Sequence, residues 1–156
     1  MTDQADTSGS SWTFTAKQMG DACEMLVAAE LTLAGIPALK MPDNWPHYDV
    51  IAEPPKGDTQ RISVKARTYK SGSNFVDYRQ GGEFDWIAAV IIKDSGEREF
   101  YIIPRKIFEL RAKTSGSNAK RHETYCKIDQ MRVKFPEYID NFRLFHEGVT
   151  GMSALG

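Results

Sequence analysis

An acid and an amine, Asp49 and Lys65, are the pair of residues in this chain best suited to chemistry at a phosphate group. Each lies in a short segment of alternating apolar and polar residues, 47–53 and 62–67, and a turn containing proline and glycine separates the segments. Because strand side chains alternate between faces, pairing of these segments would bring both groups to one side of a small sheet. A carboxylate and an amine held together can activate water at a metal-bound phosphate. The alternative is an ordinary hairpin whose charged face is solvated.

A second acid, Glu24, lies on a helix predicted just before this hairpin. Thr15 and Gln18 have the spacing of a capping box, apolar residues then recur at helical intervals, and Gly35 ends the helix. Glu24 falls on the flank of the apolar stripe, so its half-buried charge needs a cation, a metal or a backbone donor as partner. The alternative is an edge glutamate that extends its charge into solvent.

Three further strands are predicted. Residues 36–40 favour a short edge strand interrupted by proline. The run 85–93, opened by Asp85, is almost continuously apolar, which is typical of a central strand buried on both faces. A turn at 94–97 then leads into its antiparallel partner, 98–104.

The C-terminal third is predicted as helix, imperfect strand and helix. Pro104 begins a helix over 105–113, residues 122–134 alternate imperfectly, and a last helix begins near Pro136. The residues expected to face inward in the last two segments are Tyr125, Ile128, Val133, Tyr138, Ile139, Phe142 and Phe145.

The order of these motifs resembles the PD-(D/E)XK nuclease superfamily, the fold of many restriction enzymes, Holliday-junction resolvases and some homing endonucleases. A helix with GDACE, strands with YDV and ISVK, and then FDWIAAVII and FYIIPRK carry the resemblance over roughly residues 16–110. The resemblance implies an α/β fold with a restriction-endonuclease-like αβββαβ core, a small mixed sheet flanked by helices. It also implies that Asp49 is the acid of the second strand, Lys65 the lysine of the third, and Glu24 the glutamate of the first helix.

The chain departs from this family pattern at Ser63, which stands where members carry an acid two positions before the lysine. A hydroxyl is a poorer ligand than a carboxylate for a hard divalent cation. Glu24 is the first candidate to supply the missing acid, and Glu53 and Asp85 are the next.

The resemblance implies a cofactor, Mg²⁺ or Mn²⁺, held by Asp49, Glu24 and a backbone carbonyl near Val64. Lys65 would orient or deprotonate the attacking water, and Ser63 could hydrogen-bond a water in the site. The predicted catalytic residues are therefore Asp49, Lys65, Glu24 and Ser63.

Charge is unevenly distributed along the chain although the net charge is −1. Residues 1–60 carry three Lys/Arg and nine Asp/Glu, whereas residues 104–134 carry nine Lys/Arg and three Asp/Glu. This suits an enzyme that concentrates metal in one place and phosphate in another, although an ordinary mixed surface is the alternative.

Residues 68–83 are predicted as a long polar loop that contacts substrate, or else as a disordered surface loop. The predicted nucleic-acid contacts are Arg67, Lys70, Arg79, Lys120, Arg121, Lys127, Arg132 and Lys134.

Length and composition predict one domain over residues 12–147, a disordered leader over 1–11 and a flexible tail over 148–156. The chain shows no apolar run of membrane-spanning length and no secretory signal, so no membrane partner is expected. Two cysteines, Cys23 and Cys126, form no disulfide framework or zinc motif, which makes a reducing cytoplasm the simplest location.

Other chemical motifs are missing from the sequence. The three histidines, His47, His122 and His146, lack metal-binding spacing, although His47 could shuttle a proton if it is not simply structural. No phosphate-binding loop, dinucleotide fingerprint or serine-hydrolase elbow occurs.

The sequence therefore predicts a metal-dependent nuclease that hydrolyses phosphodiester bonds of nucleic acid, with DNA as the expected substrate. Many cutters of duplex DNA work as dimers, so a homodimer is among the expected assemblies. Because of Ser63, the alternative is a catalytically degenerate nuclease fold that binds nucleic acid or another protein. A third interpretation is an adaptor or immunity protein that binds no nucleic acid.

Overall fold

The fold is given by a computed structural model, which describes residues 13–70, 72, 74–79, 81–115 and 123–149. The predicted leader, 1–11, lies outside the described residues, as does the predicted tail from residue 150 onward. Of that tail, Gly148 and Val149 are described, and the Val149 N–H donates to the Glu137 carbonyl.

The N-terminal helix α1, Ala16–Leu33, forms as its pattern predicts. The Thr15 hydroxyl accepts from the Gln18 N–H, and the Gln18 side chain accepts from the Thr15 N–H, so the capping box is complete. Gly35 has a φ of 101°, a left-handed conformation that lets the chain leave the helix. The helix buries Cys23, Val27 and Leu31 against the sheet.

A mixed five-stranded sheet forms the centre of the molecule, in the order β1-β2-β3-β5-β6. Strands β3 and β5 are parallel, whereas the other neighbours are antiparallel. These pairings confirm the predicted hairpin, edge strand, central strand and antiparallel partner. The strands are β1, Ala38–Lys40; β2, Val50–Ala52; β3, Gln60–Thr68; β5, Trp86–Ile92; and β6, Arg98–Pro104.

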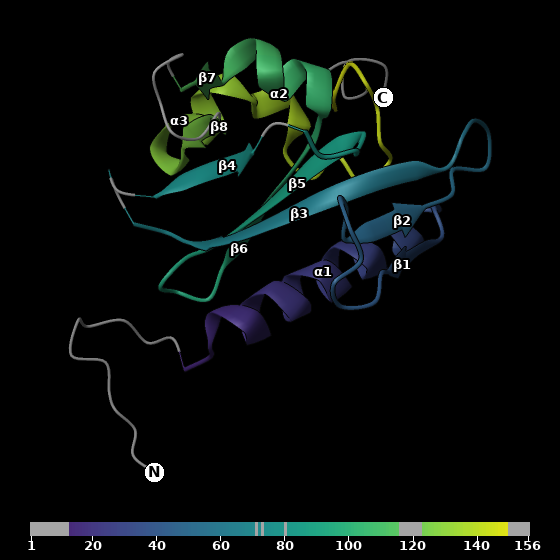
Figure 1. The fold of residues 1–156 in the computed structure, drawn as a ribbon, viewed down its shortest axis with the longest axis horizontal. Helices are drawn as coiled ribbons and strands as arrows, with labels where there is room; N and C mark the ends of the chain where they lie inside the picture. Colours follow the sequence, from purple (N-terminus) through teal and green to yellow (C-terminus); the bar gives the residue numbers. More distant parts are fainter. Residues whose placement is uncertain (1–12, 71, 73, 80, 116–122, 150–156) are drawn as a thin grey trace.

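Helix α1 lies along one face of this sheet, and the second half of the chain covers the other face (Figure 1). Central strand β5 is buried on both sides: Ala88 and Val90 pack toward α1, whereas Ile87 and Ala89 pack toward the other layer. Its nearly continuous apolar sequence follows from this position between two cores.

A small second sheet, in the order β4-β8-β7, belongs to the other layer. Its strands are β4, Phe75–Arg79; β7, Lys113–Thr114; and β8, Glu123–Lys127, and helices α2, Arg105–Arg111, and α3, Ile128–Lys134, accompany it. The prediction of a long loop over 68–83 was therefore wrong, because β4 pairs with β8 from much later in the chain. Strand β4 also occupies the crossover from β3 to β5, where an αβββαβ order would place a helix.

The prediction for the C-terminal third was wrong in two places. Residues 122–134 are not one imperfect strand, because β8 is followed directly by α3, and Val133 is exposed on that helix. Within the described residues 136–149 there is no α-helix; one 3₁₀ turn, Pro136–Tyr138, precedes irregular chain in which Asp140 and Leu144 have positive φ. The buried Asn141 side chain supports this chain by donating to the Ile102 and Phe145 carbonyls and accepting from the Phe145 N–H.

None of the helices in the described part of the chain is both long enough and apolar enough to cross a membrane.

Candidate active site

Asp49 lies at a bend just before β2 rather than within the strand predicted from residue 47. His47 has a φ of 76°, so it does not share a regular strand face with Asp49. The Ile62 carbonyl accepts from the Asp49 N–H at 2.9 Å, although Val50 is the register partner of Ile62. Asp49 and Val50 thus both lie opposite Ile62, as in a β-bulge. A bulge of this kind redirects a side chain.

The redirected Asp49 carboxylate is held at the sheet edge by β3. Its Oδ2 accepts a hydrogen bond from the Val64 N–H at 2.8 Å. In an extended strand the N–H and C=O of one residue point to the same side, so the Val64 carbonyl points to this edge as well. The carboxylate and the carbonyl predicted as metal ligands are therefore brought together beyond the end of β2.

Glu24 reaches the same place from the face covered by α1. Glu24 and Asp49 line one cavity of about 300 Å³, which we call the acidic cavity. Two further carboxylates line it that sequence reasoning missed, Asp21 and Asp43. Asp21 lies three positions before Glu24 on one helix face, a spacing that could have identified it; Asp43 comes from the 41–49 loop and gave no local signal.

Two lysines partly neutralise the acidic cavity. Lys40 on edge strand β1 contacts Glu24 at 3.3 Å and Asp43 at 3.4 Å, while Lys17 contacts Asp21 and Asp43. Burial, with a smaller contribution from nearby Asp49, raises the pKa of the Glu24 carboxyl, and Lys40 opposes this. Glu24 is thus a half-buried acid with a cation for a partner, as its place on the helix predicts.

Lys65 lies on the opposite face of β3, since Ile62 and Val64 pack toward α1. Burial lowers the pKa of the Lys65 amine, the Asp49 and Asp77 carboxylates raise it, and Arg67 lowers it further. A lowered pKa is the property that a lysine needs to accept a proton near neutral pH.

Ser63 shares this face of β3, and only 6% of its surface is exposed. Its hydroxyl has no hydrogen-bond partner among the described residues. A buried hydroxyl without a partner is unusual, and it leaves a donor and acceptor free for water or ligand at the position of the missing acid.

The other two candidates for the missing acid lie elsewhere. Asp85 precedes β5 and pairs with Arg61, accepting from its backbone N–H and guanidinium at 2.8 to 3.2 Å. Glu53 is exposed and lines a different cavity beside β1. Glu24 is therefore the acid that accompanies Asp49.

The predicted nucleic-acid contacts fall into four groups. Arg67 pairs with Asp77 at 2.8 Å and Arg132 pairs with Glu99, so both are engaged within the protein. Lys70 and Arg79 are exposed, and Lys120 and Arg121 lie outside the described residues.

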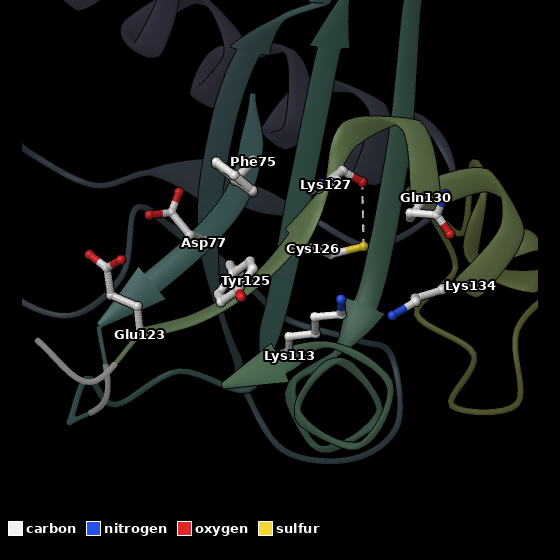
Figure 2. Close-up of a pocket in the computed structure, with 9 residues that line it drawn as sticks. All are labelled: Phe75, Asp77, Lys113, Glu123, Tyr125, Cys126, Lys127, Gln130 and Lys134. Carbon is white, nitrogen blue, oxygen red and sulfur yellow. Dashed lines mark hydrogen bonds between the residues drawn. The ribbon is translucent and has the colours of Figure 1, made fainter. Parts of the chain in front are cut away.

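Lys127 and Lys134 line a cavity of about 640 Å³ between the second sheet and α3, which we call the lysine cavity (Figure 2). Lys113, which sequence reasoning missed, joins them there because β7 pairs with β8. The other lining residues are Phe75, Asp77, Glu123, Tyr125, Cys126 and Gln130.

The donor atoms of the acidic cavity suit a hard divalent cation. Mg²⁺ is commonly held by one or two carboxylates, with water and substrate phosphate completing its shell. Asp49, Glu24 and the Val64 carbonyl match this donor chemistry, although no group of three or more His, Cys, Asp and Glu in the described residues is arranged to hold a metal.

Comparison with known proteins gives structural matches only. The chain matches no protein-family profile and no curated protein sequence. A bacterial homing endonuclease, I-Ssp6803I, aligns with 91% of this chain and 99% of its own, at 22% identity and a TM-score of 0.55. A Holliday junction resolvase from the archaeal hyperthermophile Archaeoglobus fulgidus aligns with 72% of this chain and 90% of its own, at 10% identity and a TM-score of 0.41.

The fold and the site lead to one classification. A helix carrying Glu24 precedes a hairpin that brings Asp49 to β3, the strand of the mixed sheet that carries Lys65. With the likeness to the homing endonuclease over nearly the whole chain, this arrangement gives the protein the restriction-endonuclease-like fold of the PD-(D/E)XK nucleases.

Proposed function

We propose that this protein is a metal-dependent nuclease that hydrolyses phosphodiester bonds of nucleic acid, with DNA as the expected substrate. One observation carries the proposal: the Asp49 carboxylate, held by the Val64 N–H, lies at a sheet edge that Glu24 approaches from one face and Lys65 from the other. An acid pair and a buried amine around one point are the components of metal-assisted phosphate hydrolysis.

Each residue then has a defined role. Asp49, Glu24 and the Val64 carbonyl would hold Mg²⁺ or Mn²⁺, which supplies Lewis-acid polarisation of the scissile phosphate. Lys65 orients water or takes a proton from it, and its charge offsets the charge that develops on the phosphate. Ser63 donates a hydrogen bond to water in the site through its free hydroxyl.

The structural comparison supports the same proposal. The solved structure that this chain resembles is that of a homing endonuclease, and the likeness covers nearly all of both chains. Two buried cysteines that form no disulfide suit a cytoplasmic enzyme. We include a homodimer in the proposal because two sites in one assembly could cut both strands of a duplex.

A second candidate is a nuclease fold that binds nucleic acid without cutting it. Ser63 favours this function because it removes one acid from the metal site. The Lys40–Glu24 ion pair favours it too, since a protein amine already neutralises one of the remaining acids.

The test is incubation of the purified chain with supercoiled plasmid, linear duplex and single-stranded DNA, each with Mg²⁺, with Mn²⁺ and with EDTA. Lys65→Ala is assayed in parallel, because it distinguishes this protein from a contaminating nuclease. Size-exclusion chromatography with light scattering gives the oligomeric state in the same buffers.

Cleavage that requires metal and is lost in Lys65→Ala would support the nuclease. Salt-dependent binding without cleavage of any substrate would support the second candidate. An absence of both binding and cleavage would contradict both candidate functions.

A further inference from the structure

The lysine cavity carries positive charge that the protein does not neutralise. Lys113, Lys127 and Lys134 form no ion pair with any described acid, in contrast to Lys17, Lys40 and Lys93. The Lys134 amine donates to the Arg111 carbonyl at 3.2 Å, and Figure 2 shows the Lys113 and Lys134 amines turned toward each other beside Cys126. Two ammonium groups that converge on a hollow form a site for an anion with several oxygens.

An aromatic pair lies next to these lysines. Phe75 of β4 and Tyr125 of β8 contact edge to face, with 5.4 Å between ring centroids. Phe75 is 36% exposed, so the pair is open to the cavity rather than buried in the core. Aromatic faces beside unpaired cations are the elements that hold an unstacked base and its phosphate.

The acids of the cavity lie apart from the lysines. Asp77 and Glu123 occupy the opposite side of the view in Figure 2, and Asp77 is already neutralised by Arg67. The phosphate end of a ligand would therefore lie toward Lys113 and Lys134, and its base toward Phe75 and Tyr125.

We propose that the lysine cavity holds one unpaired nucleotide of the nucleic-acid substrate, its phosphate on Lys113 and Lys134 and its base against Tyr125. A space of about 640 Å³ is of the size that encloses a small ligand, whereas a paired base within a duplex cannot leave its stack to enter without an energetic cost. The preferred substrate is then nucleic acid with an unpaired position, such as a single strand, a bulge or a branch.

The inference rests on the proposed nuclease function, and it connects the acidic cavity with the lysine cavity. Strand β3 joins the two cavities: the Val64 N–H donates to Asp49 of the acidic cavity, and Arg67 pairs with Asp77 of the lysine cavity. A strand anchored in the lysine cavity would thus lie along β3, which carries Lys65.

The test measures binding of the full chain to three fluorescent probes in EDTA: a DNA duplex with one unpaired nucleotide, the same duplex fully paired, and the single strand. Wild type should bind the first and third about tenfold more tightly than the paired duplex. Tyr125→Ala and the double variant Lys113→Gln/Lys134→Gln should each lose this preference.

Matched controls separate stacking and phosphate binding from loss of folding. Tyr125→Phe keeps the ring and should keep the preference, and Lys56→Gln, in the exposed 53–59 turn, should leave it unchanged. For the single strand, the double lysine variant should lower the slope of log Kd against log salt by about 0.7, the value for one lost phosphate contact. Thermal melts verify that every variant is folded.

Loss of preference in the cavity variants alone, with both controls intact, would support the inference. The inference would be overturned if the preference persisted in Tyr125→Ala and in the double lysine variant, or if wild type bound all three probes equally. The nuclease proposal would then still be supported by metal-dependent cleavage. Failure to bind or cut any nucleic acid would overturn both.

Discussion

The acidic cavity and the lysine cavity make opposite use of charged side chains. In the acidic cavity, acids outnumber the lysines that pair with them, so negative charge is left over for a metal. In the lysine cavity, three lysines have no acidic partner among the described residues, so positive charge is left over for phosphate. In the proposed nuclease, the acidic cavity would hold the metal and the lysine cavity would hold the substrate.

Lys65 lies where the two regions meet. On either side of it along β3, Val64 contacts Asp49 of the acidic cavity and Arg67 pairs with Asp77 of the lysine cavity. Burial lowers the pKa of the Lys65 amine. Changes at Lys65 and in each cavity should therefore have separable effects on cleavage, binding and stability.

The largest effect is expected at Lys65. Lys65→Ala should reduce the metal-dependent cleavage rate by about 10²–10⁴-fold, the usual contribution of a proton-transfer group. Binding of nucleic acid at the lysine cavity should remain, because Lys113 and Lys134 are untouched. Single-turnover cleavage and binding in EDTA measure the two effects on one preparation.

Lys65→Met sharpens this result because it keeps the length of the side chain. Removing a buried amine should raise the free energy of unfolding at neutral pH by about 0.5–2 kcal/mol, measured by urea unfolding. This difference in unfolding free energy should shrink as pH rises through the lowered pKa of wild-type Lys65. There the amine loses its proton in the folded wild type but keeps it in the unfolded chain, so wild type becomes more stable. A Lys65→Met variant that still cuts DNA would exclude Lys65 from catalysis.

Asp49→Asn tests the acidic cavity alone. An asparagine oxygen can still accept from the Val64 N–H, so stability should change by less than about 0.5 kcal/mol. Cleavage should fall by roughly a hundredfold, since metal stabilisation of the transition state is worth several kcal/mol.

Asp49→Ala is the matched variant, because it also removes the acceptor for the Val64 N–H. It should cost an additional 1–3 kcal/mol or so of stability. Equal melting temperatures for the two variants would refute the role of Asp49 in holding the sheet edge.

Ser63→Asp should strengthen the acidic cavity by restoring the acid of the family pattern. A third carboxylate near Asp49 and Glu24 should tighten Mg²⁺ binding about tenfold, as measured by titration calorimetry. Without metal the variant should be less stable by about 1–3 kcal/mol, since the position is buried. Unchanged Mg²⁺ affinity would indicate that Ser63 lies outside the metal site.

The smallest effect is a difference in pH dependence between the cavities. The raised pKa of Glu24 means that its carboxyl takes up a proton at a higher pH than an ordinary glutamate. Metal affinity should therefore begin to fall at a higher pH on acidification than it would with an ordinary glutamate, whereas binding of single-stranded DNA in EDTA should not follow the protonation of Glu24. In Glu24→Gln this acid-side decline in metal affinity should disappear, and a decline that persists would assign it to another group.

Much of the acidic cavity could be predicted because its signals are local. The capping box, the apolar stripe of α1 and the Asp49–Lys65 hairpin each lie within short stretches of sequence. The lysine cavity could not be predicted in the same way, because β4, β7 and β8 come together from distant parts of the chain. Lys113, Phe75 and Tyr125 are consequently neighbours only in three dimensions.

The sequence alone was sufficient for the order of α1, β1, β2, β3, β5 and β6, because periodicity and capping act over a few residues. The tertiary structure alone decided where the candidate site residues point. The bend at Asp49 turns its carboxylate toward Val64, and long-range strand pairing replaces the expected loop at 68–83. It also decided which charges are free, since Arg67 and Arg132 find partners in the folded chain while Lys113 and Lys127 do not. Ion pairing and burial depend on contacts between distant segments, and no short stretch of sequence contains them.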